Sequence, residues 1–318
     1  VKTAVCKQVI PAVAGMMVTL IYGLADTYFV GYVNDPAQTA ALNVSGPCFL
    51  MLTAVSNLFG VGGASLIAQA LGKKELVRAK EISVAASYCG AIAALFYSAL
   101  MYLFMYPILQ ICGADSQSFP HASGYTMWTV VIGAFGTVMN ILFGNLVRAE
   151  GDAVAASFGV TLGGVLNIFL DALFVLPRFL GMGAVGAGIA TALSNYAAAL
   201  YFIIYIIVKR KGSVISLSPS FFLRGVRSLG EICKIGFPSA LQYALTVVAI
   251  AAQAGFVSKY GVEAEAGLGI VKKLDQLPLY FSIGVSNGLL PILAFNYAAE
   301  TYVRQKDAFV FGCAISFV

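Results

Sequence analysis

Apolar residues run along most of the chain in long stretches, separated by short polar segments. Eight stretches reach the ~20 residues needed to cross the hydrocarbon core of a bilayer, and part of a ninth follows. The second and eighth exceed that length, so we expect them to tilt or protrude. This pattern predicts an all-α, polytopic membrane protein with spans at 8–33, 38–71, 82–107, 124–147, 154–177, 183–208, 235–258 and 262–298, and a ninth starting near 308.

Composition agrees with this pattern. Hydrophobic residues make up 60% of the 318 residues and charged residues only 10%, against about 25% charged in soluble domains. The net charge of +5 follows the loops between spans, so it does not suggest a nucleic-acid partner. The six cysteines are scattered without a CxxC pair, which predicts neither a disulfide framework nor a metal site.

The basic residues give an orientation. Most of the 19 lysines and arginines flank span ends on one side, and an excess of basic residues marks the cytoplasmic side. The opposite loops 34–37 and 112–123 contain neither lysine nor arginine. We therefore expect a multi-pass protein of the cytoplasmic (inner) membrane with a cytoplasmic N-terminus. The residues on the basic side are Lys2, Lys7, Lys73, Lys74, Arg78, Lys80, Arg148, Lys209, Arg210, Lys211, Arg224, Arg227, Lys234, Arg304 and Lys306, against Arg178 and Lys259 on the other.

A polar segment divides two similar parts of the chain. Cys-Lys-(x3)-Pro occurs at 6–11 and again at 233–238, and LVRAKE at 76–81 is matched by YVRQKD at 302–307. Six spans precede the second copy, so both copies enter the membrane in the same orientation, as parallel repeats do. This predicts an N-terminal six-helix lobe at 1–208, a cytoplasmic linker at 209–234 and the start of a second lobe at 235–318.

Three acids lie well inside predicted spans: Asp26, Asp171 and Asp275. An ionised side chain at the bilayer centre costs roughly 2.5–3.5 kcal/mol on insertion scales, so such residues are kept for pairing, protonation or ion binding. Asp275 has Lys272 three residues earlier on the same helical face, which favours a structural ion pair there. Asp26 has no lysine or arginine within 18 residues, which favours a functional role.

Neutral oxygens accompany these acids. Asn167 precedes Asp171 by one helical turn, and Thr191 precedes Asn195 by the same spacing. Facing a common interior, two carboxylates and these oxygens would suit a hard monovalent cation. They would equally suit a proton, because nearby carboxylates raise one another's proton affinity. The residues alone leave both readings open.

Other features of the sequence are weaker indications of function. Pro11 precedes Asp26 in the first span and is a candidate hinge, although a static kink explains it equally well. The GMGAVG run at 181–186 fits GxGxxG without the strand that a dinucleotide site requires, and GxxxxGK[ST], GxSxG and HExxH are absent. We therefore expect a protein that is not an enzyme and needs no cofactor. Candidates to line a substrate cavity are Tyr22, Asn195, Gln242, Gln253 and Asp275.

Together, an ordered set of motifs resembles one family. Pro11 is followed by LADTYFVG (24–31), GVGGASLIAQALGKK (60–74), RAEGD (148–152) and LNIFLDALF (166–174). The set is similar to that of the multidrug and toxic compound extrusion family, and the resemblance covers essentially the whole chain.

The resemblance implies twelve spans in two six-helix lobes and the export of amphipathic, often cationic, small molecules in exchange for H⁺ or Na⁺. It also implies a cation site at Asp26, Asn167, Asp171 and Thr191. The span at 235–258 lacks the acid that one branch of the family uses, which places the chain closer to the DNA-damage-inducible type. We further expect a monomer in the lipid bilayer whose last spans are missing, since the chain stops within span nine.

One alternative within the superfamily is a lipid-linked oligosaccharide flippase. Such a protein should have a larger basic cavity, and Lys272 and Lys273 are the only hint of one.

Overall fold

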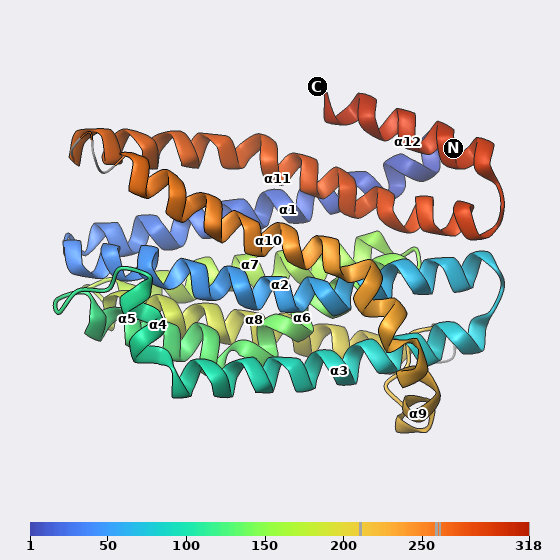
Figure 1. Cartoon of the computed structure of the whole chain (residues 1–318), viewed down its shortest axis with the longest axis horizontal. Helices are drawn as coiled ribbons and strands as arrows, with labels where there is room; N and C mark the ends of the chain where they lie inside the picture. The colour runs from blue at the N-terminus through green and yellow to red at the C-terminus, as the bar shows by residue number, and fades with distance from the viewer. Residues whose placement is uncertain (210–211, 258–259, 261, 318) are drawn as a thin grey trace.

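The computed structural model describes residues 1–209, 212–257, 260 and 262–317, with the side chains of all of these except 254, 255, 262–270 and 273. Four residues used in the sequence analysis lie outside this description: Arg210, Lys211, Lys259 and the side chain of Lys273. The described chain is a bundle of long helices without a strand (Figure 1). Its helices are α1 Lys2–Tyr32, α2 Pro36–Gly72, α3 Leu76–Leu103, α4 Met105–Ile111, α5 Phe119–Thr126, α6 Ala134–Ala149, α7 Ala153–Val175, α8 Gly183–Lys209, α9 Phe222–Gly225, α10 Leu229–Val257, α11 Val262–Ala298 and α12 Tyr302–Ser316, with a π-helical segment η1 at Met127–Ile132 and 3₁₀ turns η2 Pro219–Phe221 and η3 Val226–Ser228.

The predicted membrane spans are present. Seven helical stretches are long and apolar enough to cross a membrane, or eight if the bent pair Phe119–Ile132 and Ala134–Ala149 forms one span. The expectation of an all-α, polytopic membrane protein is thereby confirmed. Two short elements depart from it: α4 follows α3 as a separate helix, and α12 begins at Tyr302 rather than near 308.

The fourth span is bent where one continuous helix was predicted. Its two parts meet at 51° around Gly133, next to the π-helical turns of η1. A Cβ atom at Gly133 would lie 2.6 Å from the carbonyl oxygen of Trp128 and 2.7 Å from that of Thr129. Only glycine fits this bend, which hydropathy alone does not reveal.

α2 lies in the middle of the bundle and packs against α3, α6, α10 and α11. Its small residues allow close approach, as is usual between membrane helices. A Cβ atom at Gly63 would lie 2.9 Å from the Cβ of Ala86 on α3, and one at Gly62 would meet the backbone of Ile232 on α10. The small-residue run at 60–74 is therefore a packing surface, as its composition suggested.

The internal repeat extends to the helix bounds. α1 begins at residue 2 and α10 at 229, α2 covers 36–72 and α11 covers 262–298, and α3 and α12 begin at 76 and 302. The offset is thus 227 (229 − 2) or 226 (262 − 36). The turns before α3 and α12 also correspond, since Lys74 and Glu300 both have positive φ angles, 61° and 56°.

The repeated helices exchange partners across the bundle. α1 lies along α11, and α10 lies along α2 (Figure 1). A Cβ atom at Gly236 of α10 would meet the backbone of Leu58 on α2, and a Cβ at Gly288 of α11 would lie 2.6 Å from the Cα of Val9 on α1. Because the backbones of α1 and α11 are in close contact, a movement of α1 would displace α11 directly.

The segment 209–234 is more ordered than a simple polar linker. Val214 and Ile215 are buried in the core cluster. The Ser83 hydroxyl accepts a hydrogen bond from the Ser216 amide at 3.0 Å, and the Tyr88 hydroxyl donates to the Leu217 carbonyl at 3.1 Å. Its last residues form the first turns of α10, because α10 starts at residue 229 rather than 235.

Candidate functional site

Three helices bring the four predicted cation-site residues to the bundle interior. α1 carries Asp26, α7 carries Asn167 and Asp171, and α8 carries Thr191. α7 packs along both α1 and α8. Asp171 is fully buried, and Asn167 and Thr191 are 1% and 5% exposed. The Asn167 amide donates to the Thr191 hydroxyl at 3.4 Å, which joins α7 to α8.

Several buried oxygens at this site lack hydrogen-bond partners among the described residues. Both carboxylate oxygens of Asp171 and the Oδ1 atom of Asn167 are buried without a hydrogen-bond partner among the described residues. An unsatisfied buried polar group costs about 1–3 kcal/mol, and more if it is charged. A proton on Asp171 or a small cation bound by these oxygens would remove that cost.

Tyr125 belongs to the same group, and the sequence did not indicate it. Its hydroxyl donates to Oδ2 of Asp26 at 3.4 Å. The side chain comes from α5 and is 9% exposed, and it lies near Asp171 and Tyr22. No local pattern could reveal this contact, because 99 residues separate Tyr125 from Asp26.

Two of the predicted cavity residues adjoin the group. Tyr22 precedes Asp26 by one turn of α1, and a Cβ atom at Gly164 of α7 would lie 3.2 Å from the Tyr22 ring. Asn195 donates to the Thr191 carbonyl at 2.9 Å and accepts from the Asn140 amide at 2.8 Å. Asn140 on α6 is a further polar neighbour that the sequence did not single out.

The other three cavity candidates come from helices that do not carry the carboxylates. Gln242 and Gln253 on α10 and Asp275 on α11 are exposed. Among the described residues, no hydrogen bond or ion pair joins them to Asp26 or Asp171, and none joins Asp275 to Lys272. The local ion pair favoured by the spacing of Lys272 and Asp275 is therefore not formed in this structure.

Pro11 lies inside α1, which continues unbroken from residue 2 to 32. A proline cannot donate the hydrogen bond to the carbonyl four residues earlier, here that of Lys7. The helix is thus weakened at Pro11 without being interrupted, and a hinge role stays a prediction.

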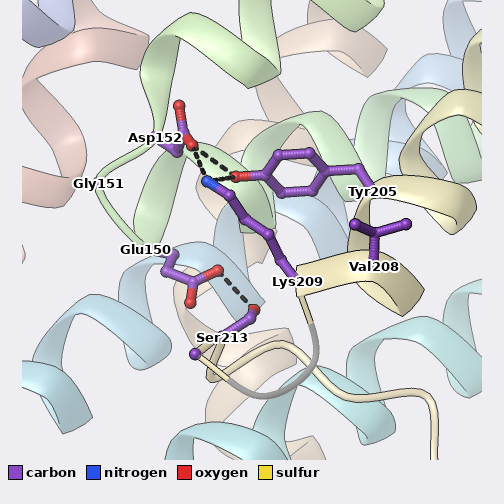
Figure 2. A pocket seen from close by; sticks show the side chains of 8 residues that line it. Glu150, Gly151, Asp152, Tyr205, Val208, Lys209 and Ser213 are labelled. Atoms are coloured by element: carbon purple, nitrogen blue, oxygen red, sulfur yellow. Dashed lines mark hydrogen bonds and ion pairs between the residues drawn. The ribbon is translucent and has the colours of Figure 1, made fainter.

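A second polar group surrounds the RAEGD turn between α6 and α7, at the predicted cytoplasmic end (Figure 2). Asp152 caps α7 by accepting from the Ala155 amide at 3.0 Å. It also accepts from the Lys209 ammonium at 2.7 Å and the Tyr205 hydroxyl at 2.5 Å. Partial burial acts to raise the pKa of Asp152, but these hydrogen bonds hold the pKa below its ordinary value.

The same turn also forms hydrogen bonds with the linker 209–234 and with α1. Glu150 accepts from the Ser213 hydroxyl at 2.7 Å and from the Val214 amide at 2.8 Å. The Gln8 amide of α1 donates to the Gly151 carbonyl at 2.7 Å. A cavity of about 560 Å³ opens between the turn and the end of α8. Because its acids are already paired, this place is a structural junction of α1, α7, α8 and the linker.

Comparison with known proteins agrees with the geometry. The sequence profile of the MatE family matches residues 11–173, which is just over half of the chain and contains Asp26, Asn167 and Asp171. The chain belongs to the MatE family.

The relatives of this MatE chain include named export proteins. It is 30% identical over 298 residues to multidrug export protein MepA of Staphylococcus saprophyticus, covering 94% of this chain and 65% of that protein. The match to MepA of Staphylococcus aureus has the same identity and coverage. The chain therefore spans about two thirds of the length of these relatives. They are export proteins rather than enzymes, in line with the missing catalytic motifs.

Solved structures confirm the MatE fold. A MATE crystal structure in the straight conformation superposes with a TM-score of 0.90 at 25% identity, covering 99% of this chain and 70% of that one. The all-α, MATE-like fold predicted from the sequence is thereby confirmed, while its division into lobes at 1–208 and 235–318 stays a prediction.

Proposed function

We propose that this protein is a multidrug efflux antiporter that exports amphipathic, often cationic, compounds in exchange for H⁺ or Na⁺. The observation that carries the proposal is the fully buried Asp171, whose two carboxylate oxygens have no hydrogen-bond partner among the described residues. Asp26 is close enough to Asp171 to interact by charge. Asp26, Asn167, Asp171 and Thr191 would form the coupling site.

The energetics favour reversible binding of an ion at this site. An ionised carboxylate at the bilayer centre costs roughly 2.5–3.5 kcal/mol, so the empty site is unstable and the occupied site is not. Exchange of a monovalent cation for one proton cancels the electrical work. A 100-fold substrate gradient then costs about 2.7 kcal/mol, which an ion gradient of the same size supplies.

α1 is positioned to transmit the state of the site. It carries Asp26 toward α7 and packs along α11 on its other side. A Cβ atom at Gly284 or Gly288 of α11 would meet the backbone of Val13 or Val9. A small displacement of α1 on ion binding must therefore move α11 or be resisted by it. Pro11 lies within this contact and would be the hinge.

The remaining expectations follow from the same proposal. We place the protein in the cytoplasmic membrane as a monomer with its N-terminus in the cytoplasm, and assign it to the DNA-damage-inducible type of the family. The lobes would meet at the linker 209–234. The two first-lobe carboxylates favour cationic substrates over the anionic ones of a lipid-linked oligosaccharide flippase. Tyr22, Asn195, Gln242, Gln253 and Asp275 remain the candidates for contact with substrate.

Dye efflux from cells that express the protein tests the proposal. Asp26→Asn should abolish efflux of a cationic dye, and so should a protonophore or the removal of sodium, depending on the coupling ion. Asp307→Asn is the matched control, because Asp307 is an exposed carboxylate on α12. Undiminished efflux by Asp26→Asn would overturn the assignment, and so would efflux insensitive to both ion treatments.

A further inference from the structure

The polar linker between α8 and α10 lies against the first turns of α3. A Cβ atom at Gly225 of α9 would meet the backbone carbonyl of Glu81 and would lie 3.1 Å from the Cβ of Ala85. The ring of Tyr88 on α3 lies 5.4 Å from the ring of Phe222 on α9. α9 therefore packs on one face of α3, at the edge of the bundle (Figure 1).

This contact is at the predicted level of the membrane surface. The charged residues at the start of α3 end with Glu81, and no charged residue follows until Asp115. The predicted span 82–107 thus begins where Gly225 packs. Tyrosine is enriched at this level of a membrane, and the Tyr88 hydroxyl donates to a linker carbonyl, that of Leu217, at 3.1 Å. We place the linker beside α3 in the headgroup layer rather than in the bulk cytoplasm.

α9 also lies on the face of α3 that is open to lipid farther along the helix. Ile92 and Phe96 follow Tyr88 at steps of four residues, so the three side chains share one face. Ile92 is 60% exposed and Phe96 is 69% exposed. In contrast, every residue from 82 to 87 is buried. The linker contributes to that burial and takes the place that lipid would have at the start of the span.

The surface that the linker leaves uncovered is apolar and basic. Leu223 is 82% exposed and Val226 is 37% exposed. Arg224 and Arg227 are exposed as well, and among the described residues neither forms an ion pair. Apolar and basic side chains on one short segment at this depth are typical of an element that lies in the membrane interface.

The acids near these two arginines are offset by other residues. Arg78 of α3 forms ion pairs with Glu75 at 3.3 Å and with Glu231 of α10 at 3.1 Å. Lys80 adjoins Glu81 in the chain and balances its charge. The positive charge of the linker therefore calls for an anion from outside the described chain. Acidic phospholipids give the cytoplasmic leaflet a negative surface potential that attracts basic residues placed next to a span.

We propose that the linker turn 219–228 is a membrane-surface anchor, which inserts Leu223 into the interface and binds acidic phospholipid headgroups through Arg224 and Arg227. A guanidinium group can donate two parallel hydrogen bonds to one lipid phosphate. The linker turn continues directly into α10, so the bound lipid holds the start of α10 at the bilayer surface. This inference rests on the predicted spans and on the contacts with α3, and it is independent of the proposed transport activity.

Tryptophan fluorescence of the protein in lipid nanodiscs tests the depth. The wild type has one tryptophan, Trp128, whose signal is subtracted. Phospholipids brominated on the acyl chain near the headgroup should quench the new tryptophan of Leu223→Trp strongly. The control is Leu76→Trp, because the exposed Leu76 begins α3 five residues before Glu81, about 8 Å along the helix. Quenching at 223 that is no stronger than quenching at 76 would overturn the placement in the interface.

The same Leu223→Trp variant tests the headgroup. At equal lipid fractions, brominated phosphatidylglycerol should quench at least about threefold more than brominated phosphatidylcholine. Adding Arg224→Gln and Arg227→Gln should make the two lipids equal. The matched control adds Arg304→Gln and Lys306→Gln, which remove the same charge from exposed positions at the start of α12, and it should keep the preference.

Three outcomes would overturn the headgroup assignment: equal quenching by the two lipids, a preference that survives the loss of both linker arginines, and an equal loss of preference in the α12 control. The last outcome would show general charge attraction in place of a site. Because none of these readouts measures transport, their failure is distinct from failure of the proposed function.

Discussion

The hydroxyl of Tyr125 donates a hydrogen bond to Oδ2 of Asp26 across 3.4 Å and so joins α5 to α1. A donor stabilises the ionised carboxylate relative to the protonated or cation-bound form. If Asp26 binds the coupling ion as proposed, Tyr125 would therefore help to set how readily Asp26 releases it, although the contact lies at the outer limit of hydrogen bonding.

Tyr125→Phe should slow ion-driven dye efflux about threefold to tenfold, because the ion is released less readily without the donor. Tenfold corresponds to about 1.4 kcal/mol, within the range for a hydrogen bond to a charged group. Efflux rates at several external pH values and sodium concentrations measure the effect. Tyr102→Phe, an exposed tyrosine on α3, is the control, and equal rates for both variants would remove Tyr125 from the site.

The α2–α10 contact offers a prediction about packing. A Cβ atom at Gly236 would overlap the backbone of Leu58, whereas one at Gly230 would meet nothing within 4 Å. Gly236→Ala should destabilise this arrangement by about 1–3 kcal/mol, as overpacking does. Gly230→Ala, on the same helix, should change stability by no more than about 1 kcal/mol. Thermal unfolding in detergent compares them, and equal melting temperatures would refute the close contact.

The RAEGD turn gives a prediction that depends on pH. Asp152 is the N-cap of α7 and accepts from Lys209 and Tyr205. Asp152→Ala should cost about 1–2 kcal/mol, as the loss of a helix cap does. Because the folded-state pKa of Asp152 is lowered, this stability is present above the unfolded value of about 3.9 and is lost as pH falls toward the lower folded pKa.

Thermal unfolding of wild type and Asp152→Ala at several pH values measures this. The difference in melting temperature should be constant near neutrality and shrink below about pH 4. A difference that stays the same at acidic pH would show that the carboxylate charge does not contribute.

Much of the fold was readable from the sequence because the bilayer restricts the choices. The long apolar stretches predicted the long helices, although α1, α3, α10 and α12 each begin about six residues before the predicted span. The match of 76–81 with 302–307 anticipated the corresponding starts of α3 and α12. The bend at Gly133 was not readable, since hydropathy carries no information about the carbonyl oxygens of Trp128 and Thr129 that a side chain would strike.

The candidate site, like the fold, was only partly predictable from the sequence. Asp26 and Asp171 stood out because an acid in an apolar span is costly, and helical spacing placed Asn167 beside Asp171. Tyr125 was missed because a tyrosine near a membrane surface is ordinary, and only the packing of α5 brings its hydroxyl to Asp26.

The central claim is that the buried carboxylate of Asp171 couples an ion to transport. The direct measurement is dye accumulation in reconstituted vesicles under an imposed proton or sodium gradient, with dye binding measured on the same samples. Wild type and Asp307→Asn should accumulate dye only with one of the gradients. Asp171→Asn should still bind dye but accumulate it at least tenfold more slowly. Accumulation by Asp171→Asn at the wild-type rate would contradict the account.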